Sequence, residues 1–471
     1  MIDLLEKIPQ AERDAVGRIA ATVAAAGGRA LIVGGSVRDA LMGRESKDVD
    51  MEVFGVPDER LRGILEKDFA LDLVGASFGV IKLHHLDVDI SLPRRESKSG
   101  SGHRGFDIRS DPFLPVEQAA RRRDFTINAL YFDPLTHEVI DPWNGLNDLK
   151  NKVLRHVSDA FAEDPLRVLR GMQFVARFGL RPDAATVELC RSIKPEGLAA
   201  ERQFEEWAKL LCKGGAIADG LAFLRATGWV GYYPELAALI GCRQDPQWHS
   251  EGDVWNHTCL CLDAFAADRT GDADEDLIVG LAVLCHDFGK PATTSLIDGR
   301  YRSFRHDVEG LEPTMSFLRR LTNEERILRD VPPLVTQHMQ PFALFAARAG
   351  DSAIRRLALR VGRIDRLIRV ERADMRGSVP VKSGDWKLEE PLEWLSAAAE
   401  RLRVAAAAPS PILMGRDVLA EGIAPSPLVG RILEKCFQAQ LDGVFCTHDG
   451  ALEYMRALPE LSGAGAEMGE R

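Results

Sequence analysis

Two kinds of segment are missing from this 471-residue sequence, a membrane-spanning apolar run and a secretion signal. No apolar stretch approaches the roughly 18 residues that a spanning helix needs. The first twenty residues, MIDLLEKIPQAERDAVGRIA, mix acidic and basic side chains from the third position and contain no apolar segment that leads to a cleavage site. The sequence therefore predicts a cytoplasmic protein that does not associate with a membrane.

Cysteine is scarce, and none of the eight cysteines forms a C-x-x-C pair. This spacing argues against a redox motif or a zinc ribbon and fits a reducing compartment. We expect buried free thiols with structural roles at Cys190, Cys212, Cys242, Cys259, Cys261, Cys285, Cys436 and Cys446.

Positive charge is also in deficit, because 60 Lys and Arg face 71 Asp and Glu, for a net charge of −11. This balance excludes a nonspecific basic coat on nucleic acid, although the total does not say where positive charge gathers. Residues 352–372 carry seven arginines and two acidic residues. Some of these arginines fit ordinary solvated faces, and others fit a local basic surface that binds a negatively charged partner. The hydrophobic content of 45% excludes disorder as the main state.

Short β-rich runs occupy the first 150 residues, and a helical period takes over from Asp164. This change predicts an α+β protein, with a mixed β-sheet in an N-terminal head followed by all-α regions. The expected strands are Ala30–Val33, Val49–Phe54, Leu71–Val74, Val80–Leu83, Val88–Leu92 and Ala129–Phe132.

A glycine turn and an acidic pair carry the first chemical signal. Gly34 and Gly35 follow a predicted strand and open a helix, where backbone amides can close on a phosphate. Asp48 and Asp50 are two positions apart on the next strand, so their carboxylates share one face. Such oxygen ligands suit Mg²⁺ and two-metal nucleotidyl transfer.

A third carboxylate and a basic loop follow the acidic pair. Asp87 and Asp89 are also two apart and share a face, so spacing alone leaves both open as the third metal ligand. The stretch Arg94–Gly105 combines basic residues with glycine and serine. It fits either a linker or a mobile loop over a polyphosphate.

Five ordered motifs then resemble the bacterial class II tRNA nucleotidyltransferase and poly(A) polymerase family over about the first 215 residues. They are LIVGGSVRDALMG, KDVDMEVFG, RRRDFTINAL, DPWNGLNDLKNKVLRHV and EDPLRVLRGMQFVARFGL. The resemblance implies catalytic Mg²⁺ on Asp48 and Asp50, and it favours Asp89 as the third carboxylate. It also implies a nucleotide-binding set of Gly34, Gly35, Arg38, Arg123, Asp124, Asn128, Asp164, Arg167 and Arg170.

Within that set, the resemblance makes Asp164 and Arg167 the pair that reads the incoming base. A carboxylate accepts from an exocyclic amino group and a guanidinium donates to a ring acceptor, so one pair can serve both cytosine and adenine. Apart from the family, the two residues fit an exposed ion pair one helical turn apart. The motif around Arg202 resembles a brace for the head, with a structural role.

An ordered series of histidine and aspartate marks the second half of the chain, where ligands beside an apolar core favour a bound divalent ion. The series resembles the HD phosphohydrolase superfamily, which implies hydrolysis of a phosphoester such as a 2′,3′-cyclic phosphate on damaged RNA ends. Ni²⁺, Mn²⁺ and Fe all suit the ligands. The implied ligands are His257, His286, Asp287 and Asp374, with His306 and His338 for a second ion.

The predicted function is addition of CMP and AMP, from CTP and ATP, to the tRNA 3′ end. Enzymes that add only A, only CC or a poly(A) tail remain alternatives, as does an RNA-binding head beside a catalytic HD domain. The expected domains are a nucleotidyltransferase head at 1–150, a helical neck that binds nucleotide and RNA at 151–245, an HD domain at 246–378 and a helical region at 379–471.

Overall fold

The computed structural model describes residues 4–46, 48–72, 80–98, 106–379 and 389–462. The chain divides into two compact units, Met1–Tyr232 and Tyr233–Arg471. The division into four domains stays a prediction. Within the described residues, no helix combines the length and the apolar character that crossing a membrane requires.

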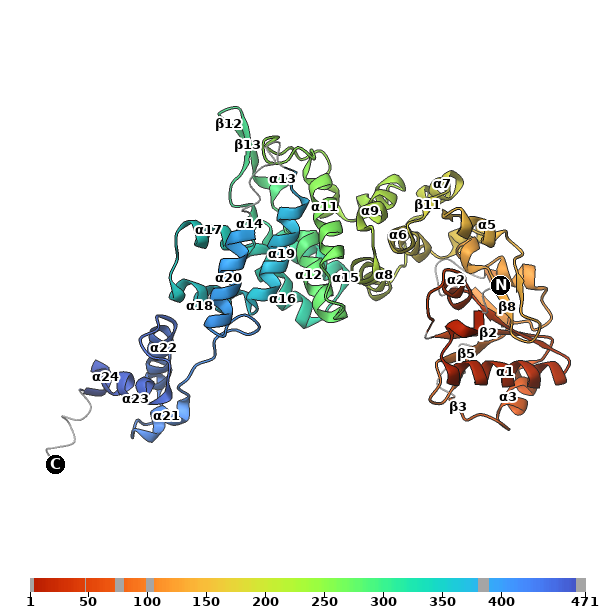
Figure 1. Ribbon diagram of the computed structural model, residues 1–471, viewed down its shortest axis with the longest axis horizontal. Coiled ribbons are helices and arrows are strands. Elements are labelled where there is room, and N and C mark those ends of the chain that lie inside the picture. Colours follow the sequence, from red (N-terminus) through yellow and green to blue (C-terminus); the bar gives the residue numbers. More distant parts are fainter. Residues whose placement is uncertain (1–3, 47, 73–79, 99–105, 380–388, 463–471) are drawn as a thin grey trace. The chain divides into compact units, whose positions relative to one another are not determined.

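A seven-stranded mixed sheet forms the centre of the head, in the order β3-β4-β5-β2-β1-β8-β9 (Figure 1). β1 and β2 pair antiparallel, whereas β2 and β5 pair parallel. The expected α+β class is confirmed, but β9 was not predicted and Ala129 lies outside β8. The strands are β1 (Arg29–Val33), β2 (Val49–Phe54), β3 (Leu71–Asp72), β4 (Val80–Leu83), β5 (Val88–Ser91), β8 (Tyr131–Asp133) and β9 (Glu138–Ile140). Val74, the expected end of the third strand, lies outside the described residues.

Alternating burial along β2 explains which face carries the acidic residues. Val49, Met51 and Val53 are at most 1% exposed and belong to the core beneath the sheet. Helices α1 (Gln10–Ala25) and α3 (Asp58–Leu65) supply the other side of this core. The intervening Asp50 therefore points away from the core.

The basic stretch after the sheet is partly a strand. Residues Arg94–Lys98 form β6, which pairs antiparallel with β7 (Phe106–Ser110). The expectation of a continuous flexible segment was therefore wrong for these five residues. The rest of that segment, 99–105, lies outside the described residues.

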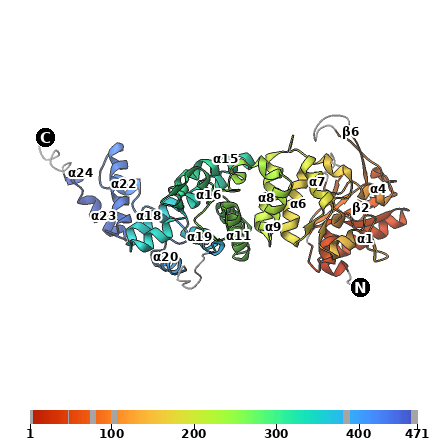
Figure 2. The ribbon, with the colours of Figure 1, turned by 90° about the horizontal axis from the view of Figure 1, so that it is seen from above.

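Three of the helices that follow the sheet in the first unit pack together. α6 (Leu166–Phe178) packs against α8 (Ala200–Lys213) and α9 (Ile217–Ala226), as Figure 2 also shows. The backbones of α6 and α9 approach closely at Gly220, where an added Cβ would lie 2.8 Å from the carbonyl oxygen of Met172. This packing holds the polar face of α6 against the head.

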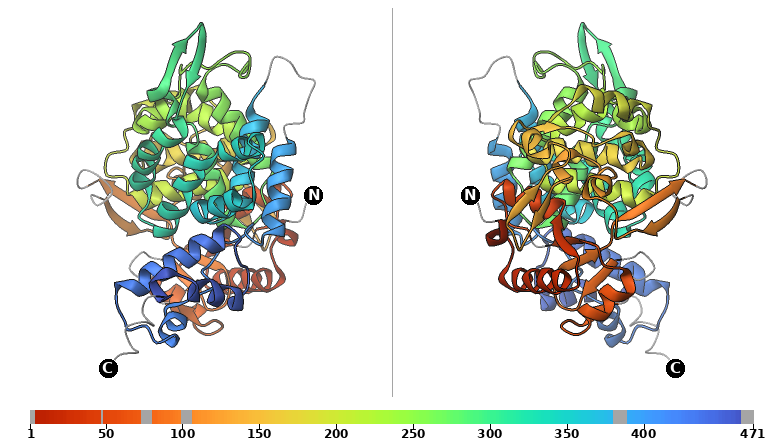
Figure 3. Two further views of the ribbon diagram at one scale, coloured as in Figure 1. Left: turned by 90° about the vertical axis from the view of Figure 1, so that its left-hand side faces the viewer. Right: turned by 90° about the vertical axis from the view of Figure 1, so that its right-hand side faces the viewer.

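The second unit is a helical bundle around α11 (Val254–Ala267), α12 (Ala273–Cys285), α16 (Glu325–Gln337) and α19 (Ile364–Gly377). The hairpin of β12 (Thr294–Ile297) and β13 (Arg300–Ser303) projects from it (Figure 3). Helices α21 (Gly415–Ala420), α22 (Pro427–Leu441) and α23 (His448–Arg456) form a separate apolar core near the C-terminus.

Five of the seven arginines in the segment 352–372 pair with carboxylates, so most of the expected local positive charge is compensated. Arg366 binds Glu275 through two hydrogen bonds of 2.7 Å and also binds Asp330 at 2.9 Å. Further pairs join Arg356 to Asp442, Arg363 to Glu275, Arg369 to Asp276 and Arg372 to Asp268. These arginines tie helices together.

All eight cysteines are free thiols, as expected. Five of them are buried, but Cys446 is exposed, because it lies in the short connection between α22 and α23. The expectation of burial was therefore wrong at Cys446.

Candidate functional site

A cavity of about 470 Å³ in the first unit brings together all nine residues that the resemblance assigns to the nucleotide. Eight basic side chains and three acidic ones line it, so it is strongly basic within an acidic protein. Its lining is Gly34, Gly35, Arg38, Asp50, Arg122, Arg123, Asp124, Asn128, Asp164, Leu166, Arg167, Arg170, Gln173, Phe174, Arg177, Arg202 and Lys209.

Gly34 forms the turn between β1 and α2 (Gly35–Leu41) at the edge of this cavity. Its φ of +73° favours glycine, and an added Cβ would lie 2.9 Å from a guanidinium nitrogen of Arg123. The backbone can therefore approach a ligand, and Arg123 can lie against it, only while this position lacks a side chain.

A buried carboxylate organises the basic side chains. Asp124 accepts hydrogen bonds from the Phe125 amide at 2.7 Å, Asn128 Nδ2 at 2.9 Å and Arg170 Nε at 2.7 Å. Although burial opposes its charge, Arg170 and Asn128 lower the pKa of Asp124 to about 2. Asn128 in turn accepts a hydrogen bond from Arg38. Asp124 thus fixes Arg170 directly and Arg38 through Asn128.

Aromatic rings hold Arg38 on its other side. Its guanidinium carbon lies 4.5 Å from the ring centre of Phe178 and 5.2 Å from that of Phe174. Arg38 is only 5% exposed, and burial lowers its pKa. The cavity is therefore preorganised for an anion, since its guanidinium groups need not be ordered on binding.

Two acidic residues of the predicted triad meet across neighbouring strands. Asp50 on β2 lies in register with Asp89 on β5. Partial desolvation, together with the negative charges of Asp89 and Asp48, raises the pKa of Asp50 against the opposing effect of Arg123. Asp89 also pairs with Lys82 at 2.9 Å. A divalent cation near these carboxylates would relieve this repulsion.

Asp87 lies just before β5, and its carbonyl accepts a hydrogen bond from the amide of Val49. The negative charge of Asp89 is among the main causes that raise the pKa of Asp50, whereas the charge of Asp87 is not. The register therefore favours Asp89 over Asp87 as the third carboxylate.

Asp164, expected with Arg167 to read the incoming base, is held by Arg202 in this structure. Its carboxylate accepts hydrogen bonds from the Leu166 amide at 3.0 Å and from Arg202 at 2.8 Å. Arg167 instead donates to the backbone carbonyls of Ala160 and Arg122. The backbone amide of Arg167 also donates to the carbonyl oxygen of Asp164 at 3.1 Å, so that the two residues lie one turn apart at the start of α6.

Arg202 is one of the cavity residues that the predicted nucleotide-binding set did not include. It lies on α8, 38 positions from Asp164, and its motif was assigned only a bracing role. The strong amphipathic period of this helix could have placed Arg202 on a polar face, but not beside Asp164.

Four histidines converge in the second unit. His257 Nε2 lies 3.4 Å from His286 Nε2 and 2.9 Å from Asp374 Oδ1. His306 Nε2 lies 3.1 Å from His338 Nε2 and 3.5 Å from Asp287 Oδ1. The other oxygen of Asp287 lies 3.3 Å from His286 Nε2, so its carboxylate joins the two groups.

The opposite nitrogens of these rings are anchored. The Nδ1 atoms of His286, His306 and His338 donate to backbone carbonyls at 2.6 to 2.8 Å. That of His257 lies 3.1 Å from the carboxylate of Glu251. Because Nδ1 carries the proton toward a carbonyl, Nε2 presents its lone pair to the centre, as metal ligands do.

Buried charge around Asp287 also fits a cation. Asp287 is 1% exposed, and neither carboxylate oxygen accepts a hydrogen bond of good geometry from the described residues, although Lys290 Nζ lies 2.7 Å away. Burial and the neighbouring imidazoles lower the pKa of His338 to about 4, which keeps it neutral. A cavity of about 640 Å³ reaches Asp374, His306 and Lys290.

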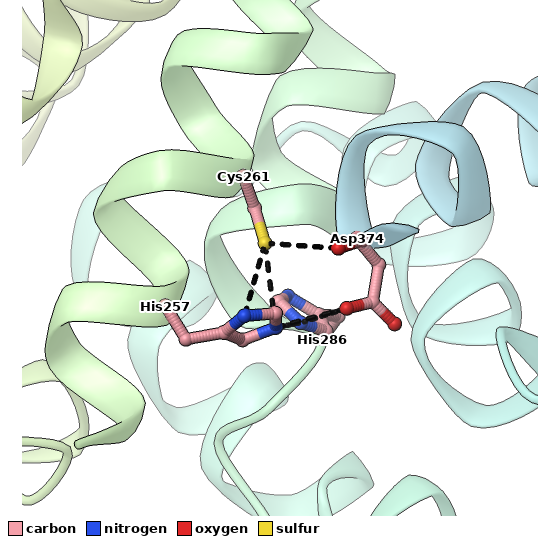
Figure 4. Close-up of side chains that lie close together, drawn as sticks. All are labelled: His257, Cys261, His286 and Asp374. Carbon is pink, nitrogen blue, oxygen red and sulfur yellow. Dashed lines mark hydrogen bonds and ion pairs between the residues drawn. The ribbon is translucent and has the colours of Figure 1, made fainter. Parts of the chain in front are cut away.

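One further side chain joins this cluster. Figure 4 shows Cys261 beside His257, His286 and Asp374, and the four ligand atoms lie within 4.8 Å of one another. Burial raises the pKa of the Cys261 thiol to about 11, despite the opposing effect of His257. The sequence placed Cys261 one helical turn after His257 but gave no sign that its sulfur points toward His286 and Asp374.

Comparison with known proteins adds a family context. Residues 30–155 match the family described as "Poly A polymerase head domain". The chain is 33% identical over 419 residues to the "Multifunctional CCA protein" of Xanthomonas campestris pv. campestris strain B100, covering 85% of this chain and 95% of that protein. It is 36% identical over 304 residues to the protein of the same name from Xylella fastidiosa strain 9a5c, covering 62% and 70%.

Solved structures share the fold. The Bacillus stearothermophilus CCA-adding enzyme in complex with CTP gives a TM-score of 0.65 at 20% identity and covers 98% of this chain and 99% of that chain. The Thermotoga maritima CCA-adding enzyme complexed with tRNA gives 0.59 at 18%, covering 96% and 97%.

Proposed function

This chain belongs to the family of the multifunctional CCA proteins, and we propose that it adds CMP and AMP, from CTP and ATP, to the 3′ end of tRNA. One observation carries the proposal. A single basic cavity holds the whole predicted nucleotide-binding set and opens at Asp50, beside the acidic face of the sheet. A triphosphate held there would present its α-phosphate to these carboxylates.

Two groups of residues would serve nucleotidyl transfer: arginines that bind the triphosphate, and carboxylates that bind metal ions beside the tRNA 3′-hydroxyl. Arg38 and Arg170 are fixed by the buried Asp124 and Asn128, and they would hold the triphosphate without further ordering. Divalent ions on Asp48, Asp50 and Asp89, which we take to be Mg²⁺, would supply activation of the attacking 3′-hydroxyl and charge neutralisation at the leaving pyrophosphate.

Base selection is assigned to Asp164 with two arginines. In this structure Asp164 is held by Arg202, and Arg167 lies on the same cavity wall. Cytosine and adenine each present an amino donor beside a ring acceptor, which a carboxylate and a guanidinium can match. Uracil and guanine present an oxygen acceptor at the corresponding position and would oppose the carboxylate.

A matrix of primers and nucleotides tests the activity. Purified protein receives tRNA ending at the discriminator base, at C or at CC, with CTP and ATP supplied separately. CCA addition requires C on the first two substrates and A on the third. Addition of only A or only CC would indicate a restricted enzyme, and long A tails on unrelated RNA would contradict the proposal.

The second unit would hydrolyse phosphoesters at an HD-type metal centre. The carrying observation is the convergence of His257, His286, Asp287 and Asp374, with His306 and His338 beside them. A bound divalent transition ion, such as Ni²⁺, Mn²⁺ or Fe, would supply an activated hydroxide for attack on phosphorus. Lys290 lines the same cavity, and its ammonium group pairs with Asp287 and with Gln244, each at 2.7 Å.

Two variants separate the sites. His286→Ala should abolish metal-dependent hydrolysis of a 2′,3′-cyclic nucleotide and leave CCA addition unchanged. Asp48→Ala should abolish CCA addition and leave the hydrolysis of the cyclic nucleotide unchanged. Transfer that survives Asp48→Ala would mean that the acidic face is misassigned, and a head that binds RNA without transferring nucleotides would leave the HD domain as the only enzyme.

A further inference from the structure

Cys261 lies where a ligand to the HD centre would lie. It is fully buried on α11, one turn after His257, and Figure 4 shows its sulfur directed toward that ring. The Sγ atom is 3.3 Å from His257 Nε2. None of the residues implied by the HD signature is a cysteine, so this sulfur is additional to the expected ligand set.

The packing of α19 fixes the sulfur in place. An added Cβ at Gly377 would lie 2.4 Å from Cys261 Sγ and 2.6 Å from the Cys261 backbone nitrogen. Only glycine permits this approach, which brings α19 and its Asp374 directly over the sulfur. The Sγ atom lies 3.8 Å from the backbone carbonyl oxygen of Asp374.

The distances suit a shared ion. Ligands bound at about 2.1 Å for nitrogen or oxygen and about 2.3 Å for sulfur lie roughly 3.0 to 3.6 Å apart when neighbouring bonds make angles near 90 to 110°. From His257 Nε2, the observed separations are 2.9 Å to Asp374 Oδ1, 3.3 Å to Cys261 Sγ and 3.4 Å to His286 Nε2.

A second observation, at Asp287, also indicates a bound cation in this cluster. The carboxylate of Asp287 is buried beside His286 and accepts no hydrogen bond of good geometry from the described part of the chain. Its Oδ2 also lies 3.6 Å from His257 Nε2. Lys290 Nζ supplies an ion pair to this carboxylate at 2.7 Å, and the neighbouring group of His257, Cys261, His286 and Asp374 adds further ligand atoms that a cation could bind.

We propose that Cys261 binds the ion of the HD centre through its sulfur, so that this centre takes a thiophilic divalent transition ion in preference to Mg²⁺. The inference rests on the proposed HD function, since it assumes that His257, His286 and Asp374 bind an ion. The thiol gives its proton to solvent when the metal binds, because the thiolate is the ligand.

Cobalt substitution tests the ligand. The full chain is treated with chelator and titrated with Co²⁺, and the absorption spectrum is recorded. Wild type should develop a sulfur-to-cobalt charge-transfer band in the near ultraviolet. Cys261→Ser should lose that band while keeping visible cobalt absorption. Cys259→Ser is the matched control, because Cys259 lies on the same helix and belongs to none of the candidate metal groups among the described residues, and it should keep the band.

Competition with Zn²⁺ gives a second readout. Cys261→Ser should weaken Zn²⁺ binding by about 10 to 100-fold, while its much weaker Mg²⁺ binding stays unchanged. Cys261→Ala repeats the measurement if the serine variant does not fold, as judged by circular dichroism.

The outcomes separate the two claims. Cobalt that binds wild type without the charge-transfer band, or a band that persists in Cys261→Ser, would overturn the role of Cys261 and leave the HD centre standing. Wild type that binds no ion, with His286→Ala indistinguishable from it, would overturn the HD centre as well.

Discussion

Replacing Asp124 with asparagine should unfold the first unit more easily and weaken nucleotide binding together. One carboxylate oxygen accepts from the Phe125 amide and from Asn128, and the other accepts from Arg170 Nε at 2.7 Å. An asparagine that keeps the first two bonds must direct its amide group at Arg170, so a donor faces a donor. The guanidinium also loses its counter-charge.

The size of the effect follows from the pKa. A fall from 3.8 to about 2 corresponds to about 2 kcal/mol in favour of the folded state. The opposed donors add to this, so we expect a total loss of about 3 kcal/mol in the free energy of unfolding. Because the pKa is lowered on folding, this stabilisation is complete above about pH 4 and is lost as the pH falls through 2.

Hydrogen exchange against urea, read by mass spectrometry on peptides from α6, measures the unfolding of the first unit separately from the second. The difference between wild type and Asp124→Asn should shrink from pH 5 to pH 2. CTP titrations should show weaker binding, because Arg38 and Arg170 lose their common anchor.

Asp133→Asn is the matched control. Asp133 is also buried, pairs with Arg29 Nε at 2.7 Å and accepts from the Leu135 amide, but it lies outside the cavity lining. Its variant should lose about 1 kcal/mol, because Arg29 is partly exposed, and should bind CTP normally. A stable Asp124→Asn protein with unchanged CTP affinity would refute the anchoring role.

Three further results are expected. Asp50→Asn should slow transfer about 10³-fold, because a metal carboxylate contributes several kcal/mol to the transition state, and single-turnover addition to tRNA measures this; a loss below tenfold would contradict the assignment. Arg202→Ala should lower discrimination of CTP against UTP about tenfold in kcat/KM, since Asp164 loses its support; equal losses for both nucleotides would indicate a structural role instead. Chelation should remove phosphoesterase activity and leave the helical circular dichroism signal intact, and unfolding on chelation would disprove a preformed site.

The sheet and the acidic pair could be predicted because they depend on local periodicity. Alternating burial places Val49 and Met51 in the core and Asp50 on the opposite face, which the strand pattern alone indicates. The nucleotide-binding set could be predicted only through ordered motifs, since its members come from separate elements.

Partners distant in sequence could not be predicted. Arg366 and Glu275 are 91 positions apart, so the arginine-rich segment looked like basic surface until α12 was packed against α19. The ion pair of Asp164 with Arg202 and the approach of Cys261 to Asp374 could not be predicted for the same reason, because these partners are also far apart in sequence. In each case the sequence shows the residue type on one side of an interaction, and only tertiary packing determines which residue lies opposite it.

The ion pairs between α12 and α19 have a consequence for the proposed HD centre. Glu275 and Asp276 at the start of α12 pair with Arg366 and Arg369 of α19. His286 directly follows the last residue of α12, and Asp374 lies on α19. These salt bridges set the spacing of the helices without the ion. If the proposed centre binds an ion, its ligands would stay in position when that ion leaves, so that one metal would replace another without refolding of the helices.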